Sequence, residues 1–195
     1  MATESPPQHQ GGAARTENEA ALVARARSGD RAAFGALVER YAGSARRIAR
    51  AVLGDPDDAD DAAQDAFLSA LVKLDQFDAR RPFGPWLLRI VANAAADRRR
   101  RRTVRRAEPL DSNVGGQTPG PEAAAESGEL AERLQAALAE LPERRQLAEV
   151  LFDVEGYGHA EIADILGIPE GTVRSDVFHA RRFLRERLAN LKEEW

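Results

Sequence analysis

The sequence predicts an all-α protein with two small helical domains, a bundle and a helix-turn-helix domain, joined by a flexible linker. Apolar residues recur at spacings of three and four over most of residues 20–106 and 129–195, the period of amphipathic helices. Residues 107–128 are instead rich in Gly, Pro and acidic side chains, which is typical of a flexible linker. The 195 residues include no Cys, which excludes a disulfide scaffold and thiolate metal sites.

The N-terminal segment, residues 1–19, has hardly any large apolar side chains, so we expect a disordered tail. It also lacks the charged-then-apolar pattern of a signal peptide. From Ala20 a short helix is predicted, with Gly29 as its stop and Asp30 as the cap of the next helix. That second, longer helix continues until Gly54, where the pattern breaks.

Residues 57–74 form the cleanest amphipathic helix of the sequence. Its apolar stripe consists of Ala59, Ala62, Ala63, Ala66, Phe67, Ala70, Leu71 and Leu74. The opposite side carries Asp60, Asp61, Gln64, Asp65 and Leu68. The helix dipole accounts for some acidic residues in a first turn but not for so many, so a solvated face and a docking surface for a basic partner both stay open. A helix-loop-helix calcium site is excluded, because residues 55–65 lack its required glycine and final glutamate.

A predicted loop over residues 75–85 contains Phe77 and Phe83, and a helix follows from Trp86. This helix runs into a dense set of arginines at 98–102, 105 and 106. Aromatic rings beside a cationic helix suit single-stranded nucleic acid, since bases stack on the rings while arginines hold the backbone. The alternative is that Trp86 anchors a small helical core and that the two phenylalanines cap it.

In the second domain, helices are predicted over residues 130–141 and 144–154, followed by a helix-turn-helix over 158–188. Gly167 can adopt the left-handed backbone of a tight turn, and Pro169 is tolerated at the start of the next helix. That helix carries Arg174, Phe178, Arg181 and Arg185 on one face. Arginines from the first turn onward suit a DNA major groove, whereas a helical hairpin with a solvated face is the alternative.

The net charge of −4 hides an uneven distribution. Residues 20–106 contain 18 Lys and Arg against 11 Asp and Glu, whereas residues 129–195 contain nine against 14. The basic charge is therefore clustered in the first domain, as expected for a phosphate-facing surface. No phosphate-binding glycine motif and no paired metal-binding histidines occur, so the sequence gives no support for an enzyme, a cofactor or a metal site. No apolar run reaches membrane-spanning length, so we expect a soluble cytoplasmic protein without membrane insertion.

Five stretches in this order resemble the extracytoplasmic-function group of bacterial RNA polymerase sigma factors, in the sigma-70 family. They lie at residues 29–41, 57–67, 86–97, 141–142 and 167–175. The resemblance covers roughly residues 20–190. It implies sigma region 2 over residues 20–106 and sigma region 4 over 129–195. It further implies that the protein binds core RNA polymerase, recognises the minus-35 and minus-ten promoter elements and helps to melt DNA.

The resemblance also implies which residues form each site. The polymerase-binding residues would be Asp57, Asp60, Asp61, Gln64, Asp65 and Leu68. The residues that hold melted minus-ten DNA would be Phe77, Arg80, Arg81, Phe83, Trp86, Arg89, Asn93, Arg98, Arg99 and Arg102. The residues that read duplex minus-35 DNA would be Glu170, Thr172, Arg174, Ser175, Phe178, Arg181, Arg182 and Arg185. An anti-sigma partner that covers the polymerase-binding surfaces is a further expectation from the family.

Two residues of the last helix depart from the family pattern. Asp176 and His179 stand where relatives commonly carry basic residues. An aspartate facing phosphates is repelled, although it can accept a hydrogen bond from a cytosine amino group. One hypothesis is that the minus-35 contact is rotated or its sequence preference altered; the alternative is that Asp176 points away from DNA.

Two other classes of protein compete with the sigma-factor interpretation. One is a stand-alone helix-turn-helix regulator, in which residues 20–106 dimerise or sense a signal. A stand-alone regulator that binds only duplex DNA has no need for an acidic helix joined to an aromatic, arginine-rich one. The other is an interaction protein that captures a partner helix between its domains. The linker also predicts domains that move relative to each other in the free protein.

Overall fold

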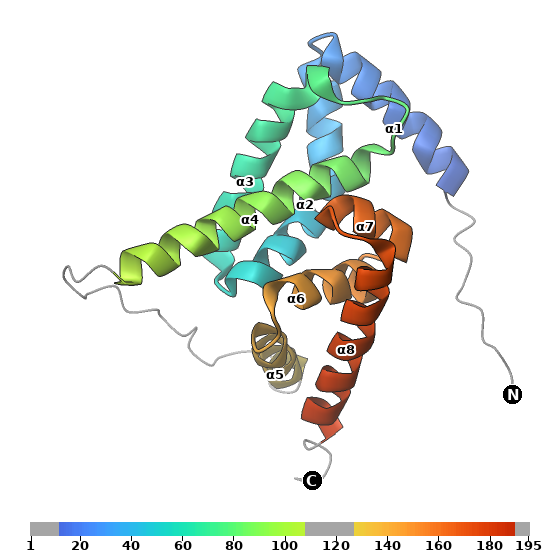
Figure 1. Cartoon of the computed structure of the whole chain (residues 1–195). Helices are drawn as coiled ribbons and strands as arrows, with labels where there is room; N and C mark the ends of the chain where they lie inside the picture. The colour runs from blue at the N-terminus through green and yellow to red at the C-terminus, as the bar shows by residue number, and fades with distance from the viewer. Residues whose placement is uncertain (1–11, 108–126, 190–195) are drawn as a thin grey trace, which may run out of the picture.

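The computed structural model describes residues 12–107 and 127–189. Within these two ranges, the regular elements are helices and none is a strand, which confirms the predicted fold class (Figure 1). Residues 1–11 of the predicted tail and residues 108–126 of the predicted linker lie outside the described residues. We call residues 12–107 the first half and residues 127–189 the second half.

The first half is a helical bundle. Its elements are α1 (Gly12–Arg27), α2 (Arg31–Leu53), α3 (Pro56–Lys73), the short 3-10 turn η1 (Leu74–Gln76) and α4 (Phe83–Ala107). Asp30 caps α2 by accepting hydrogen bonds from the backbone N–H groups of Ala32 and Ala33. Gly54 ends α2 with a φ of 76°, a conformation that favours glycine. These stops and caps match the sequence prediction.

In the first half, α1 and α4 begin earlier than predicted. α1 starts at Gly12, inside the segment expected to be disordered, and α4 starts at Phe83 rather than at Trp86. One side chain connects both helices: the Glu19 carboxylate accepts a hydrogen bond from the Tyr41 hydroxyl and another from the Phe83 backbone N–H. This long-range contact fixes α1 against α2 and α4, and no local pattern in the sequence reveals it.

Aromatic rings fill the core of the bundle beside α1. Phe77 and Phe83 are 5% and 2% exposed, and their ring centroids lie 5.6 Å apart in an edge-to-face arrangement. Trp86 packs on both, at 5.0 Å from Phe77 and 5.4 Å from Phe83. The structure therefore shows these three aromatic residues packed together in the core, as the alternative to base stacking predicted.

The second half contains the predicted helix-turn-helix. Its elements are α5 (Ser127–Ala139), α6 (Glu143–Glu149), the π-helical turn η2 (Val150–Val154), α7 (His159–Leu166) and α8 (Glu170–Ala189). Gly167 ends α7 in the left-handed conformation, with a φ of 68°. Val173 is fully buried in the angle between α7 and α8, as the sequence indicated.

The two halves pack against each other through one hydrophobic core. α7 lies beside α4, and α2 contacts α5, α6 and η2 (Figure 1). Leu88 and Val91 of α4 belong to the same buried cluster as Leu151, Ile162 and Ile165 of the second half. The structure thus differs from the expectation of freely moving domains, because both halves bury apolar surface in their contact.

Candidate functional site

The exposed side of α3 combines carboxylates with apolar side chains. All six residues predicted to bind a partner are exposed: Asp57, Asp60, Asp61, Gln64, Asp65 and Leu68. Pro56 occupies the first turn and Asp55 accepts a hydrogen bond from the Asp58 backbone N–H at 2.9 Å, so the start of the helix is well defined.

Sequence reasoning missed part of this surface. Leu71 was assigned to the buried stripe, but it is 46% exposed and joins Leu68 at 63% and Val72 at 79%. The error arises because the buried contact of α3 is made by small side chains, chiefly alanines, which bring α2 and α4 close and leave the flank of the helix open. We call the six predicted residues with Leu71 and Val72 the docking face. An exposed apolar patch rimmed by one sign of charge is typical of a protein-binding surface.

A small cavity lies between the loop before α4 and α7. Its volume is about 180 Å³, and it is lined by Gln76, Phe77, Asp78, Arg81, Pro82, Pro85, Trp86, Arg89 and Asp164. Aromatic walls with polar groups at the rim suit an unstacked base. In the loop itself, Arg80 hydrogen-bonds the carboxylate of Asp78 through both its side chain and its backbone N–H. These bonds lower the pKa of Asp78 to about 2.

Several cations predicted to hold minus-ten DNA are paired within the protein. Arg81 forms an ion pair with Asp164 at 2.8 Å, and Arg89 donates to the Asp164 carbonyl oxygen at 3.3 Å. Arg99 lies 3.7 Å from Glu143. Further along α4, Arg98 pairs with Asp58 and Asp61, and Arg102 pairs with Asp58. Asn93 is exposed on α4.

The remaining minus-ten residues differ in accessibility. Arg80 is almost fully exposed, whereas Trp86 is half-buried and lines the cavity. Phe77 and Phe83 are buried and pack against Trp86, so we correct their assignment as exposed stacking platforms; of the two, Phe77 also forms part of the cavity wall. The sequence could not distinguish these roles, because stacking and core packing use the same side chains.

The exposed face of α8 is cationic and aromatic. Ser175 and Arg185 are exposed, Phe178 is 63% exposed, and Thr172 is half-buried. Arg174 pairs with Glu170 one turn earlier, and Arg182 lies 3.9 Å from Glu186. A depression of about 500 Å³ follows this face, lined by Phe152, His159, Arg174, Val177, Phe178, Arg181, Arg182 and Arg185. Five of the eight predicted minus-35 residues therefore line this depression, whereas Glu170, Thr172 and Ser175 are not part of its lining.

Arg181 is held by groups of η2. It pairs with Asp153, and its guanidinium lies 4.7 Å from the centroid of the Phe152 ring. Glu149 neighbours Asp153 and is 5% exposed. One of its carboxylate oxygens has no hydrogen-bond partner among the described residues. Burial, and the neighbouring Asp153, raise the pKa of Glu149 to about 8. Sequence reasoning missed this carboxyl pair, since its members looked like ordinary surface acids.

Asp176 points into the second half and not toward DNA. It is 2% exposed, accepts a hydrogen bond from Arg144 Nε at 2.6 Å and lies 3.5 Å from Arg145. The hypothesis that this carboxylate alters the minus-35 contact is therefore wrong in this structure. His179 is half-buried, with its ring 5.5 Å from that of Phe178.

Neither a metal site nor a membrane span is found in the described parts. Among residues 12–107 and 127–189, no group of three or more His, Asp or Glu side chains could hold a metal ion. In the same ranges, no helix has the length and hydropathy needed to cross a bilayer.

Comparison with known proteins identifies the class to which this fold belongs. The Sigma-70 region 2 family model matches residues 37–105, and the Sigma-70 region 4 model matches residues 131–184. ECF RNA polymerase sigma factor SigW of Bacillus subtilis is 33% identical over 185 positions, which cover 87% of this chain and 96% of SigW.

Two solved structures are also similar. CnrH, solved in complex with the cytosolic domain of CnrY, matches with a TM-score of 0.67 and 30% identity, covering 89% of this chain and 98% of CnrH. RpoE of Bartonella quintana, solved with the anti-sigma factor NepR, matches with a TM-score of 0.64 and 25% identity, covering 80% and 96% of the two chains.

The chain therefore belongs to the sigma-70 family of transcription initiation factors, and within it to the ECF group. As a sigma factor, it acts with RNA polymerase in promoter-specific initiation. The family and function predicted from the sequence are confirmed, and the sigma-factor interpretation prevails over the stand-alone regulator.

Proposed function

We propose that the docking face of α3 binds core RNA polymerase. Its exposed carboxylates attract a basic surface, and Leu68, Leu71 and Val72 supply the apolar area that gives a protein interface most of its affinity. Support comes from the position of this face within the region 2 match and from the absence of any described contact that covers these three side chains.

The second proposed site holds the melted minus-ten strand on α4 and the loop before it. The cavity beside Trp86 would accept one unstacked base, and the cations around it would hold the backbone. The proposed residues are Arg80, Arg81, Trp86, Arg89, Asn93, Arg98, Arg99 and Arg102. Most of these arginines carry an internal partner, so their engagement with DNA requires an exchange of partners.

The third proposed site reads duplex minus-35 DNA with α8. Ser175 and Phe178 lie on the exposed face of the first turns, where a recognition helix contacts base edges. Arg174, Arg181, Arg182 and Arg185 would contact phosphates or guanines from the depression that they line, and Glu170 and Thr172 would contribute from the first turn of the helix.

One observation carries the whole proposal: a protein-docking face and an arginine-rich, aromatic helix share one bundle, and a helix-turn-helix is attached to it. The test is run-off transcription with core RNA polymerase and a genomic promoter library. Initiation at promoters that share two spaced elements would support it. Duplex binding without protein-dependent initiation would favour a stand-alone regulator.

The remaining proposals concern chemistry, location and partners. The protein performs no covalent step itself, works in the cytoplasm and has an anti-sigma partner, as RpoE has NepR. An anti-sigma partner that competes for the docking face would reduce run-off transcription and displace polymerase from the chain in the same titration.

A further inference from the structure

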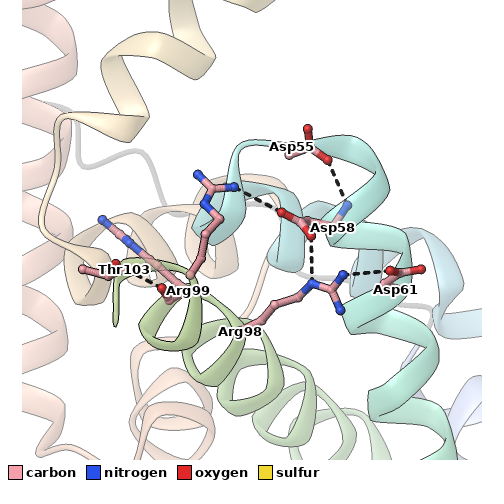
Figure 2. A network of polar contacts seen from close by, with 7 residues as sticks. Asp55, Asp58, Asp61, Arg98, Arg99 and Thr103 are labelled. Carbon is pink, nitrogen blue, oxygen red and sulfur yellow. Dashed lines mark hydrogen bonds and ion pairs between the residues drawn. The ribbon is translucent and has the colours of Figure 1, made fainter. Parts of the chain in front are cut away.

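An ion-pair network joins the proposed polymerase-binding helix to the proposed DNA-binding helix. Asp58 of α3 accepts a hydrogen bond from Arg98 Nε at 2.9 Å and another from Arg102 Nη1 at 3.1 Å. Arg98 also donates from Nη2 to Asp61, one turn further along α3, at 2.7 Å. Figure 2 shows Arg98 reaching from α4 between the two carboxylates. Each arginine is thereby held against α3.

The spacing of the four residues makes the network rigid. Arg98 and Arg102 are four residues apart on α4, and Asp58 and Asp61 are three apart on α3, so each pair lies on one face of its helix. Asp55 fixes the backbone of Asp58 from the helix start (Figure 2). Burial opposes ionisation of Asp58, yet the hydrogen bonds from Arg98 and Arg102 outweigh it and lower the pKa of this carboxyl. Asp58 is thus a charged acceptor at neutral pH.

The two carboxylates differ in their access to a partner. Asp61 is 60% exposed and belongs to the docking face, whereas Asp58 is 27% exposed and is occupied by both arginines. A basic surface that binds the docking face can therefore replace Arg98 as the ion-pair partner of Asp61. The same surface leaves Asp58 in place as the anchor of both arginines.

We propose that Asp58 is a positioning residue that holds Arg98 and Arg102 against α3, and that docking on Asp61 frees the Nη2 group of Arg98 to bind a DNA phosphate while Asp58 keeps its Nε. The inference rests on the proposed function, since it takes polymerase as the docking partner and promoter DNA as the anion. By linkage, DNA that captures Arg98 frees Asp61 for the docking partner to the same degree. The network makes each ligand favour the other.

The test measures DNA binding by the full chain in the absence of polymerase. The probe is a fluorescein-labelled, mixed-sequence 12-nucleotide single strand, followed by anisotropy over a series of salt concentrations. Asp58→Asn releases Arg102 and leaves Arg98 with Asp61 alone, so its affinity should rise about three- to tenfold and its salt slope should steepen by roughly 0.7 per added phosphate contact. Asp61→Asn releases one partner of one arginine and should give a smaller gain.

Two further variants separate pairing from net charge. Glu39→Gln removes one negative charge from an exposed position on α2 and should change the affinity less than twofold. Arg98→Gln alone should have a small effect, because its charge is already neutralised, but in the Asp58→Asn background it should abolish much of the gain. Such non-additivity is the signature of a coupled pair.

A purely structural role would lower the melting temperature of Asp58→Asn without changing its DNA affinity or salt slope, and that result would overturn the proposal. If Asp58→Asn fails to fold, Asp61→Asn serves in its place, since its side chain is exposed. Polymerase binding is measured separately. If the unaltered chain does not bind polymerase, the proposed function is refuted. If all variants bind DNA with equal affinity, only the coupling is refuted.

Discussion

At the scale of single residues, Asp176 shows how one buried carboxylate can look like a specificity determinant. It stands in the first turns of α8, but its side chain is buried and bound by Arg144. Arg144 is 55% exposed, so water can solvate its guanidinium if the carboxylate is removed. The pair therefore joins α6 to α8.

Asp176→Asn should reduce stability and leave promoter preference unchanged. The lost charge-assisted hydrogen bonds should cost about 1 to 2 kcal/mol in the free energy of unfolding, measured by urea titration. The ranking of varied minus-35 sequences, measured by competition binding, should match that of the unaltered protein. A changed ranking would show that the carboxylate reaches DNA.

Glu149 should make stability depend on pH. Its folded pKa of about 8 lies above the model-compound value of 4.5, so the unfolded chain loses this proton more easily. The stabilising contribution is therefore complete below about pH 4.5 and disappears as pH rises through 8. Urea unfolding between pH 5 and pH 8 should show this decline, and Glu149→Gln should flatten it. The hydrogen bond from Arg181 lowers the pKa of Asp153, so this neighbouring carboxylate stays charged over the same range.

At the scale of elements, α3 and α8 each divide their surface between packing and binding. α3 packs with alanines and leaves Leu68, Leu71 and Val72 exposed. α8 buries Val173, Val177 and Ala180 and presents its cations on the opposite side. In both helices the buried side fixes the orientation of the binding side.

The apolar part of the docking face should contribute strongly to polymerase affinity. Leu68→Ala combined with Val72→Ala should weaken binding to core polymerase about tenfold, measured by fluorescence titration. Stability should change by less than about 0.5 kcal/mol, because both side chains are exposed. The control is Val154→Ala, which removes a similar apolar side chain from an exposed position in η2. Equal affinities for all three proteins would place the polymerase site elsewhere.

At the scale of the whole molecule, the packing of the two halves covers part of the proposed minus-ten site. Asp164 of α7 holds Arg81 and Arg89 at the rim of the base-sized cavity. Arg47 pairs with Glu155 at 2.6 Å across the same boundary. The Arg81–Asp164 pair is exposed and individually weak, and in the second pair only Arg47 is exposed, so the shared apolar core provides most of the attraction between the halves. We therefore expect α7 to move away when DNA binds to the proposed minus-ten site.

Spin labels can measure this movement, since the chain has no Cys of its own. Spin labels are attached to Glu39→Cys in α2 and Ala139→Cys in α5. Pulsed electron paramagnetic resonance should then give a single narrow distribution of label-to-label distances in the free protein. Adding core polymerase should shift or broaden it. Asp164→Arg, which repels Arg81 and Arg89, should broaden the distribution without polymerase. A broad distribution in the unaltered free protein would instead support independent domains.

Local signals in the sequence correctly predicted where α2 and α7 end. Gly54 and Gly167 end helices where predicted, and Val173 fills the helix-turn-helix, because turn chemistry and apolar period act over a few residues. The first turns of α1 were missed, since Glu19 is fixed by Tyr41 and Phe83, both far away in the chain. Leu71 was misplaced because the period of a helix gives the direction of a stripe but not its width.

The sequence by itself determined the helical class, the order of the elements and the family. Only the tertiary structure decided which charges are available. Asp176 is buried, Asp58 is paired twice, and Asp164 caps Arg81, although the sequence presents all three as surface acids. The physical reason is that helix formation depends on neighbours in the chain, whereas the partner of a charge depends on which helices meet in space.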